Sequence, residues 1–178
     1  TGETGNLQVR GPNVFPGYWR MPEKTAEDFT ADGFFNTGDK AIIDADGYVS
    51  IVGRAKDMVI TGGLNVYPKE IELVIDDMAG VKESAVIGVP HADFGEAVLA
   101  VIVADGLVAD GLVADSPVVD GTAVTSGVPT AAEVIAHCKT QLANFKVPKR
   151  VEIIDSLPRN AMGKVQKNLL RERFAGNG

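Results

Sequence analysis

The chain has 178 residues, of which 45% are hydrophobic and 23% charged, a composition typical of a globular protein that can bury a core. Its net charge of −7 argues against non-specific binding to nucleic acid or to anionic lipid. A single cysteine excludes an internal disulfide and, with only two histidines, a cysteine-based zinc site. No apolar run reaches the roughly 18 residues that a membrane span needs, so the sequence predicts a cytoplasmic protein without a span.

The first 55 residues predict β-rich structure with little core of its own. The expected elements are strands at 6–10, 40–43 and 48–52 and a short helix at 22–29. The last two strands form a hairpin, because the turn at 44–47 ends in a glycine. The chain opens without Met in a turn-rich stretch, so we expect this segment to be the end of a larger domain.

From residue 56 onward the sequence predicts a compact α+β domain of about 120 residues. Ile71, Val74, Ile75 and Met78 follow one another at helical spacing after Pro68. The other expected elements are helices from Thr130 and at 165–174, and strands at 84–89, 97–103 and 150–154. A tandem repeat (ADGLV-ADGLV-AD) occupies residues 104–115 and predicts a surface insertion loop at 104–129.

Two segments carry residue types that suit a sugar or a phosphate. Asp39 follows a glycine and precedes an expected strand, where its carboxylate can accept hydrogen bonds from the hydroxyls of a ribose or simply cap a turn. Arg54 offers a planar fork for phosphate or ribose oxygens. Gly62 and Gly63 leave room for a ligand beside the backbone, or form an ordinary turn.

Two further segments carry charged or titratable groups. Lys164 follows a loop glycine before a helix, where it can bring positive charge to a developing oxyanion or phosphate, or remain a solvated surface lysine. His91 and Asp93 could perform acid–base chemistry, but without a serine or cysteine nucleophile a structural turn is favoured. Lys146 could meet a phosphate group of a ligand, although solvation is again the favoured interpretation.

The order and spacing of these segments resemble the C-terminal third of the adenylate-forming enzymes, the family of acyl-CoA synthetases, luciferases and non-ribosomal adenylation domains. The resemblance is carried by residues 34–39, 53–72 and 157–167, and it covers the chain apart from the region near 104–129. It implies that residues 1–55 end a large N-terminal domain and that residues 56–178 form a small, mobile C-terminal domain. In this family an acid and ATP give an acyl-adenylate and pyrophosphate, and a thiol then displaces AMP.

The resemblance also implies roles for individual residues. Lys164 is the catalytic lysine of adenylate formation, and Lys56 is the hinge between the domains. The implied ATP or AMP ligands are Asp39, Arg54, Asn65 and Lys164, and the implied CoA-facing residues are Gly62 and Gly63. ATP, Mg²⁺ and CoA are therefore expected, with the Mg²⁺ bound largely by the N-terminal part, because no metal ligand is identifiable in this chain. The family's phosphate-binding loop is absent, so we expect the chain alone to be inactive.

Residues 11–25, 63–72 and 86–96 resemble malonyl-CoA synthetases most, so malonate is the expected acid. A medium-chain or aromatic acid–CoA ligase is the alternative within the same class. A stand-alone, non-catalytic binding module is the alternative from another class, and a protein lysine acyltransferase acting on Lys164 is an expected partner. The remaining partners are the carboxylic acid, ATP, CoA and the rest of the chain's own N-terminal domain.

Overall fold

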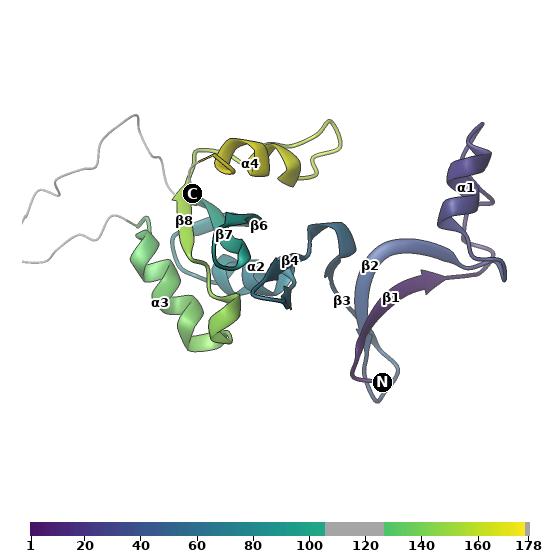
Figure 1. The fold of residues 1–178 in the computed structure, drawn as a ribbon, viewed down its shortest axis with the longest axis horizontal. Helices are drawn as coiled ribbons and strands as arrows, with labels where there is room; N and C mark the ends of the chain where they lie inside the picture. Colours follow the sequence, from purple (N-terminus) through teal and green to yellow (C-terminus); the bar gives the residue numbers. More distant parts are fainter. Residues whose placement is uncertain (106–126, 177–178) are drawn as a thin grey trace, which may run out of the picture. The chain divides into compact units, whose positions relative to one another are not determined.

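The computed structural model describes residues 1–105 and 127–176, which fall into two compact units, Thr1–Lys56 and Asp57–Gly178 (Figure 1). We call them unit 1 and unit 2. The two units meet in the sequence between Lys56 and Asp57. Most of the repeat and of the expected insertion loop at 104–129 lies outside the described residues. Within the described ranges, no helix is both long enough and apolar enough to cross a membrane.

Unit 1 contains a three-stranded antiparallel sheet and one short helix. Its elements are β1 (Thr4–Val9), α1 (Pro22–Asp28), β2 (Phe35–Ile43) and β3 (Val49–Arg54), and the strand order is β1-β2-β3. The predicted hairpin is confirmed, because β2 pairs with β3 across a turn. In this turn the Asp44 carboxylate accepts hydrogen bonds from the N–H groups of Asp46 at 3.0 Å and Tyr48 at 2.9 Å.

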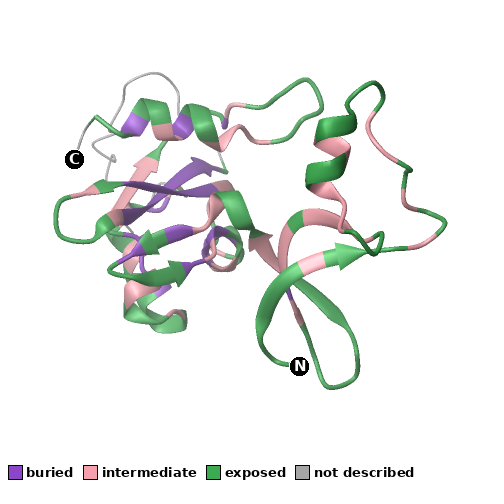
Figure 2. Ribbon diagram, turned by 45° about the vertical axis from the view of Figure 1, so that its right-hand side comes forward, coloured by how far each residue is buried: buried purple, intermediate pink, exposed green. Residues whose placement is uncertain are grey.

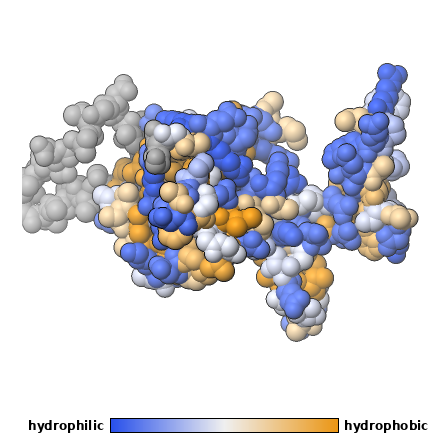
Figure 3. All heavy atoms as spheres, viewed as in Figure 1, coloured by the Kyte–Doolittle hydropathy of each residue, from blue (hydrophilic) through white to orange (hydrophobic). Residues whose placement is uncertain are grey.

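Unit 1 has almost no core. Among residues 1–56, all of which the structure describes, Ala41 is the only buried one. On β2 and β3, Ile43 pairs with Val49 and Ala41 with Ile51, and three of these side chains remain half exposed: Ile43 at 49%, Val49 at 50% and Ile51 at 59%. Figure 3 shows hydrophobic residues at the surface of this sheet, toward its N-terminal end. The sheet of unit 1 therefore carries an apolar surface that nothing within the unit covers.

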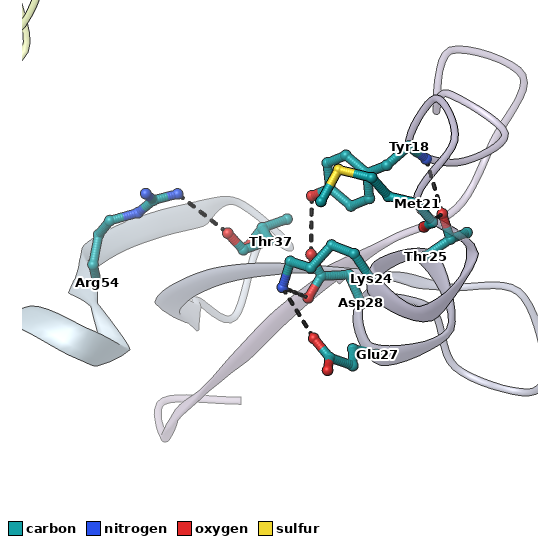
Figure 4. A network of polar contacts seen from close by, with 8 residues as sticks. All are labelled: Tyr18, Met21, Lys24, Thr25, Glu27, Asp28, Thr37 and Arg54. Carbon is teal, nitrogen blue, oxygen red and sulfur yellow. Dashed lines mark hydrogen bonds and ion pairs between the residues drawn. The ribbon is translucent and has the colours of Figure 1, made fainter.

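Aromatic contacts join the segments that flank α1 to β2, and polar contacts bond the helix to Tyr18. The rings of four residues pack against one another with centroids 5.1 to 5.6 Å apart: Phe15, Tyr18, Phe29 and Phe35. The Tyr18 hydroxyl and the Lys24 ammonium each donate a hydrogen bond of 2.9 Å to the Asp28 carboxylate (Figure 4). These two donors, Lys24 first, hold the pKa of Asp28 below its usual range.

Unit 2 is a sheet with helices on both faces. Its elements are β4 (Val59–Thr61), β5 (Leu64–Val66), α2 (Pro68–Asp76), β6 (Val81–His91), β7 (Gly95–Ala104), α3 (Ala131–Gln141), β8 (Arg150–Ile153) and α4 (Lys167–Phe174). The strand order is β5-β4-β7-β6, and β8 pairs in parallel with β7 on the edge that also meets β4. All other described strand pairs are antiparallel. The predicted α+β class is confirmed.

Strands β6 and β7 are buried on both faces (Figure 2). Alternate side chains point to opposite faces of a strand, so each strand contributes to two clusters. One cluster joins β6 and β7 to α2 and α3 and includes Ile71, Ile75, Val86, Val98, Ile102 and Val134. The other joins them to α4 and includes Ile87, Leu99, Val101, Leu170 and Phe174. Burial on both faces explains why these strands appear in the sequence as continuous apolar runs.

Asp39 lies elsewhere than expected. It was placed just before a strand, but it lies inside β2, which begins at Phe35. Gly38 has a φ of 76° and the register shifts between Lys40 and Ala41, so β2 is irregular where the sequence resembled a loop.

Two features of unit 2 also differ from expectation. The last helix begins at Lys167 instead of residue 165, because Val165 forms a bridge with Arg159. Strands β4 and β5 were not predicted, since each has three residues and they form a hairpin around Gly62 and Gly63. The turn interpretation of this glycine pair is thus confirmed.

Candidate functional site

Asp39 and Arg54 lie opposite each other on neighbouring strands of unit 1. They are partners in the β2–β3 register, and Arg54 Nε donates a 2.8 Å hydrogen bond to Asp39 Oδ1. The Arg54 guanidinium also donates to the carbonyl oxygen of Thr37 at 3.3 Å (Figure 4). The side chains are 50% exposed for Arg54 and 22% for Asp39. A guanidinium beside an accessible carboxylate can meet a ligand that has both hydroxyl groups and anionic oxygens.

Gly62 and Gly63 form the turn between β4 and β5 in unit 2. Their φ values of 55° and 79° are the left-handed pair that a two-residue hairpin turn requires. A Cβ added at Gly63 would have no atom within 4 Å, so the backbone here is open to a ligand. Asn65 follows on β5, paired with Ile60 of β4.

Phe94 lies beside this glycine turn and was not identified from the sequence. Its carbonyl accepts a 2.9 Å hydrogen bond from the Gly62 N–H, and its ring lies 3.7 Å from a Cβ built on Gly62. The ring centroid lies 4.8 Å from that of His91, with the two rings tilted by 33°, and the Lys149 ammonium lies 5.7 Å from the Phe94 centroid. The sequence signal was the Phe-Gly-Glu turn at 94–96. In this turn region only the polar residues His91 and Asp93 were candidates from the sequence.

His91 and Asp93 stabilise the turn between β6 and β7, as the structural interpretation predicted. The Asp93 N–H donates to His91 Nδ1 at 3.2 Å, and no serine or cysteine side chain is hydrogen-bonded to either residue in the described part of the chain. Lys146 is also accounted for, because its ammonium lies 2.6 and 2.8 Å from the two carboxylate oxygens of Glu70.

Lys164 is exposed on the loop that precedes α4. Its backbone N–H donates to Asn160 Oδ1 at 2.9 Å, and its carbonyl accepts from the Asn160 N–H at 2.9 Å. Its ammonium forms no ion pair with any residue in the ranges 1–105 and 127–176. The loop therefore holds the backbone of Lys164 and leaves its charge available to a ligand.

Lys56 is the last residue of unit 1 and lies within the short 3₁₀ helix η1 (Ala55–Asp57). An ion pair is present on each side of it. Arg54 is bonded to Asp39 within unit 1, and Asp57 accepts a 3.1 Å hydrogen bond from Arg171 of α4 within unit 2. Only Ala55 and Lys56 lie between these two attachments.

Neither a metal site nor a reactive thiol is evident in the described residues. They contain no group of three or more His, Cys, Asp or Glu side chains arranged to hold a metal ion. Cys138 is buried in the core, and burial raises the pKa of its thiol, which makes it a packing residue rather than a reactive one.

Comparisons with known proteins agree over nearly the whole chain. A family model described as the AMP-binding enzyme C-terminal domain matches residues 70–164. Feruloyl-CoA synthase from an Amycolatopsis species is 44% identical over 97% of this chain and 31% of its own length. Long-chain-fatty-acid–CoA ligase from Yersinia pestis is 42% identical, over 96% of this chain and 27% of its own length. The crystal structure of ATP-bound MatB from Rhodopseudomonas palustris is 56% identical with a TM-score of 0.78, and the match covers 98% of this chain and 31% of that one. The chain thus spans under a third of the length of these relatives.

Proposed function

Because the chain belongs to the family of AMP-binding enzyme C-terminal domains, we propose that it is the C-terminal part of an ATP-dependent acid–CoA ligase. In the proposed reaction a carboxylate attacks the α-phosphate of ATP to give an acyl-adenylate and pyrophosphate, and the CoA thiol then displaces AMP. The observation that carries the proposal is the unpaired ammonium of Lys164 on a closed loop, in a chain that matches CoA ligases over nearly its whole length.

Adenylate formation is assigned to four residues. Negative charge accumulates as the carboxylate attacks the phosphate, and the compact ammonium of Lys164 neutralises it. Asp39 accepts hydrogen bonds from the ribose hydroxyls, and Arg54 contacts the nucleotide while its bond to Asp39 fixes the orientation of that carboxylate. Asn65 is assigned a contact with phosphate. Mg²⁺ accompanies ATP and is assigned to the large N-terminal part of the ligase.

Thioester formation is assigned to the glycine turn. The open backbone at Gly63 supports passage of the pantetheine arm of CoA, since a side chain there would occupy the space. The exposed ring of Phe94 beside Gly62 supplies an apolar surface for the methylene groups of that arm.

The proposed division of the chain follows the same argument. Residues 1–55 end the large N-terminal domain, whose remainder covers the apolar surface formed by Ile43, Val49 and Ile51. Residues 56–178 form the mobile C-terminal domain, with Lys56 as the hinge. The two ion pairs that flank Ala55 and Lys56 support this hinge, because they leave only these residues to absorb a change in backbone angles.

Malonate is the acid that we propose, in a cytoplasmic ligase. The motifs in residues 11–25, 63–72 and 86–96 support it, as does the higher identity to MatB, a malonyl-CoA synthetase (56%), than to feruloyl-CoA synthase (44%). An aromatic or fatty acid is the second candidate, favoured by the similarity to feruloyl-CoA synthase and to long-chain-fatty-acid–CoA ligase. The exposed ammonium of Lys164 would also be accessible to a protein lysine acyltransferase.

The substrate is tested by acid-dependent exchange of pyrophosphate into ATP, using the intact ligase that contains this chain. Malonate, methylmalonate, acetate, octanoate and coumarate are compared. We expect exchange with malonate to exceed that with the other acids. Exchange with another acid would retain the ligase and replace malonate, and no exchange with any of them would favour a non-catalytic binding module.

The role of Lys164 is tested by measuring the two half-reactions separately. Lys164→Ala should lower the rate of adenylate formation about 100- to 1000-fold, as does removal of other groups that stabilise a transition-state charge, and should spare thioester formation from supplied acyl-adenylate. Lys139→Ala, at an exposed lysine of α3, is the control and should change neither rate. Equal loss of both half-reactions in Lys164→Ala would contradict this division of roles.

A further inference from the structure

The loop that carries Lys164 is a narrow hairpin outside the main sheet. The Gln166 N–H donates to the carbonyl of Pro158 at 2.8 Å, Arg159 and Val165 form a bridge, and the Asn160 N–H donates to the carbonyl of Lys164 at 2.9 Å. These three connections close the segment from residue 158 to residue 166 step by step toward its tip. The backbone of Lys164 is thereby tied to the strand-like segment that precedes it.

The tip of this hairpin is held by the side chain of Asn160. Its Oδ1 atom accepts hydrogen bonds from the N–H groups of Met162 at 3.0 Å and Lys164 at 2.9 Å. The Gly163 N–H donates to the Asn160 carbonyl at 2.9 Å, and the φ of 77° at Gly163 allows the chain to turn back. Asparagine is suited to this position because its side chain can replace a backbone acceptor within a turn.

Ion pairs attach the base of the hairpin to β6 before the tip and to Glu72 of α2 after it. Before the tip, the Arg159 guanidinium forms an ion pair with Glu83 of β6 and donates to the Gly163 carbonyl at 2.6 Å. After the tip, Lys167 lies 2.6 Å from Glu72, which also accepts the N–H of Val86 in β6 at 2.9 Å. With the base fixed in this way, the conformation of the tip depends on the bonds made by Asn160 and on the bond from Arg159 to the Gly163 carbonyl. Among the residues that the structure describes, only Asn160 is hydrogen-bonded to the backbone of Lys164.

We propose that Asn160 is a positioning residue for Lys164. Its side-chain oxygen holds the backbone of Lys164 in one conformation, so that only the side chain of the lysine remains to be ordered when substrate binds. A flexible four-carbon side chain places its charge poorly if its backbone also moves, and small errors in placement are costly in catalysis. The inference rests on the proposed role of Lys164 in adenylate formation.

The test uses the intact ligase and three variants of Asn160 that differ in their acceptor. Asn160→Leu has a similar volume and no acceptor, Asn160→Asp keeps the acceptor, and Asn160→Ser offers a shorter and weaker one. We expect Asn160→Leu to lower kcat for adenylate formation about 10- to 100-fold with little change in thioester formation from supplied malonyl-adenylate. Asn160→Asp should retain most of the adenylation rate, and Asn160→Ser should lie between them.

Measurements on Lys164→Ala and of thermal stability separate the possible outcomes. Unchanged adenylation in Asn160→Leu, with adenylation lost in Lys164→Ala, would overturn the inference and leave the proposed function intact. Full adenylation in Lys164→Ala would overturn the proposed function itself. Equal loss of both half-reactions with a lowered Tm in Asn160→Leu would show a purely structural role. If Asn160→Leu does not fold, equal adenylation rates in the Asp and Ser variants would overturn the inference.

Discussion

The ion pair between Glu72 and Lys167 provides a sharp test of what holds α4 to the rest of unit 2. The ammonium of Lys167 lies 2.6 Å from Glu72 Oε1, and the side chains are only 17% and 10% exposed. The same oxygen accepts the N–H of Val86 at 2.9 Å. Lys167→Met preserves the length of the side chain but removes its charge, leaving the Glu72 carboxylate buried with a single described donor.

The expected loss of stability follows from this geometry. Removing one partner of a buried ion pair costs about 3–5 kcal/mol in free energy of unfolding. The retained bond from Val86 and the residual exposure favour the lower end, so we expect about 3 kcal/mol for Lys167→Met, or roughly 12 °C in Tm for a domain of this size. Glu72→Gln keeps an acceptor for both donors and should lose about 1 kcal/mol.

The assay is urea unfolding of the 178-residue chain followed by far-ultraviolet circular dichroism. Three of the four described α-helices, α2, α3 and α4, lie in unit 2, so the signal reports mainly on this unit. Lys139→Met, at an exposed lysine of α3, is the control. The reasoning is refuted if Lys167→Met and Lys139→Met unfold within about 0.5 kcal/mol of each other, because the pair would then behave as a solvated surface pair.

Two further predictions concern the N-terminal cap of α3 and the close approach of Gly80 to Gly127. The N–H and hydroxyl of Thr130 donate hydrogen bonds to Glu133 and hold its pKa below the usual range. This capping box therefore contributes its full stability above the ordinary glutamate pKa of the unfolded chain. The contribution is lost as pH falls through the lowered pKa of the folded state. Thr130→Ala should cost about 1 kcal/mol at neutral pH, and an acid unfolding curve of unchanged slope in Glu133→Gln would contradict the pH argument. Gly80→Ala should lose on the order of 2 kcal/mol or more in urea unfolding, because its Cβ would lie 1.8 Å from the Gly127 carbonyl oxygen at a φ of +85°. Gly127→Ala, whose Cβ would meet nothing within 4 Å, should leave stability unchanged, and equal effects of the two changes would contradict the steric argument.

Local patterns were sufficient to predict the helices of unit 2. Ile71 and Ile75, spaced to lie on one face of a helix, are fully buried in α2, and the helix expected from Thr130 is present as α3, with Thr130 as its N-cap. The pairing of distant strands was not predictable, because local residue patterns do not specify which strands become neighbours. This applies to β8, which lies parallel to β7, and to β4, which pairs with the start of β7 at Gly95. Strands of three residues, such as β4 and β5, are also too short for a periodic signal.

The candidate site was predictable as a set of residues but only partly as an arrangement. The family resemblance is confirmed by the match over residues 70–164, and the roles assigned to Asp39 and Lys164 remain predictions. The bond between Arg54 and Asp39 was not among the predictions, because the expected hairpin strands at 40–43 and 48–52 stop short of both residues. Phe94 comes to Gly62 through a contact between two separate hairpins that no local pattern reveals. Asn160 was not identified from the sequence, because the chemical role in this segment was assigned to Lys164. An asparagine shortly before a glycine is nevertheless a turn signal.

The two ion pairs beside Lys56 have a consequence for protein engineering. Asp39–Arg54 lies wholly in unit 1 and Asp57–Arg171 wholly in unit 2. A recombination crossover placed between Ala55 and Lys56 would therefore keep each pair intact, because both members of a given pair would come from the same parent. A crossover on either side of this dipeptide, between Asp39 and Arg54 or between Asp57 and Arg171, would draw the two members of one pair from different parents. The peptide bonds between Arg54 and Asp57 are accordingly the junctions at which unit 2 can be exchanged between related chains without splitting either pair.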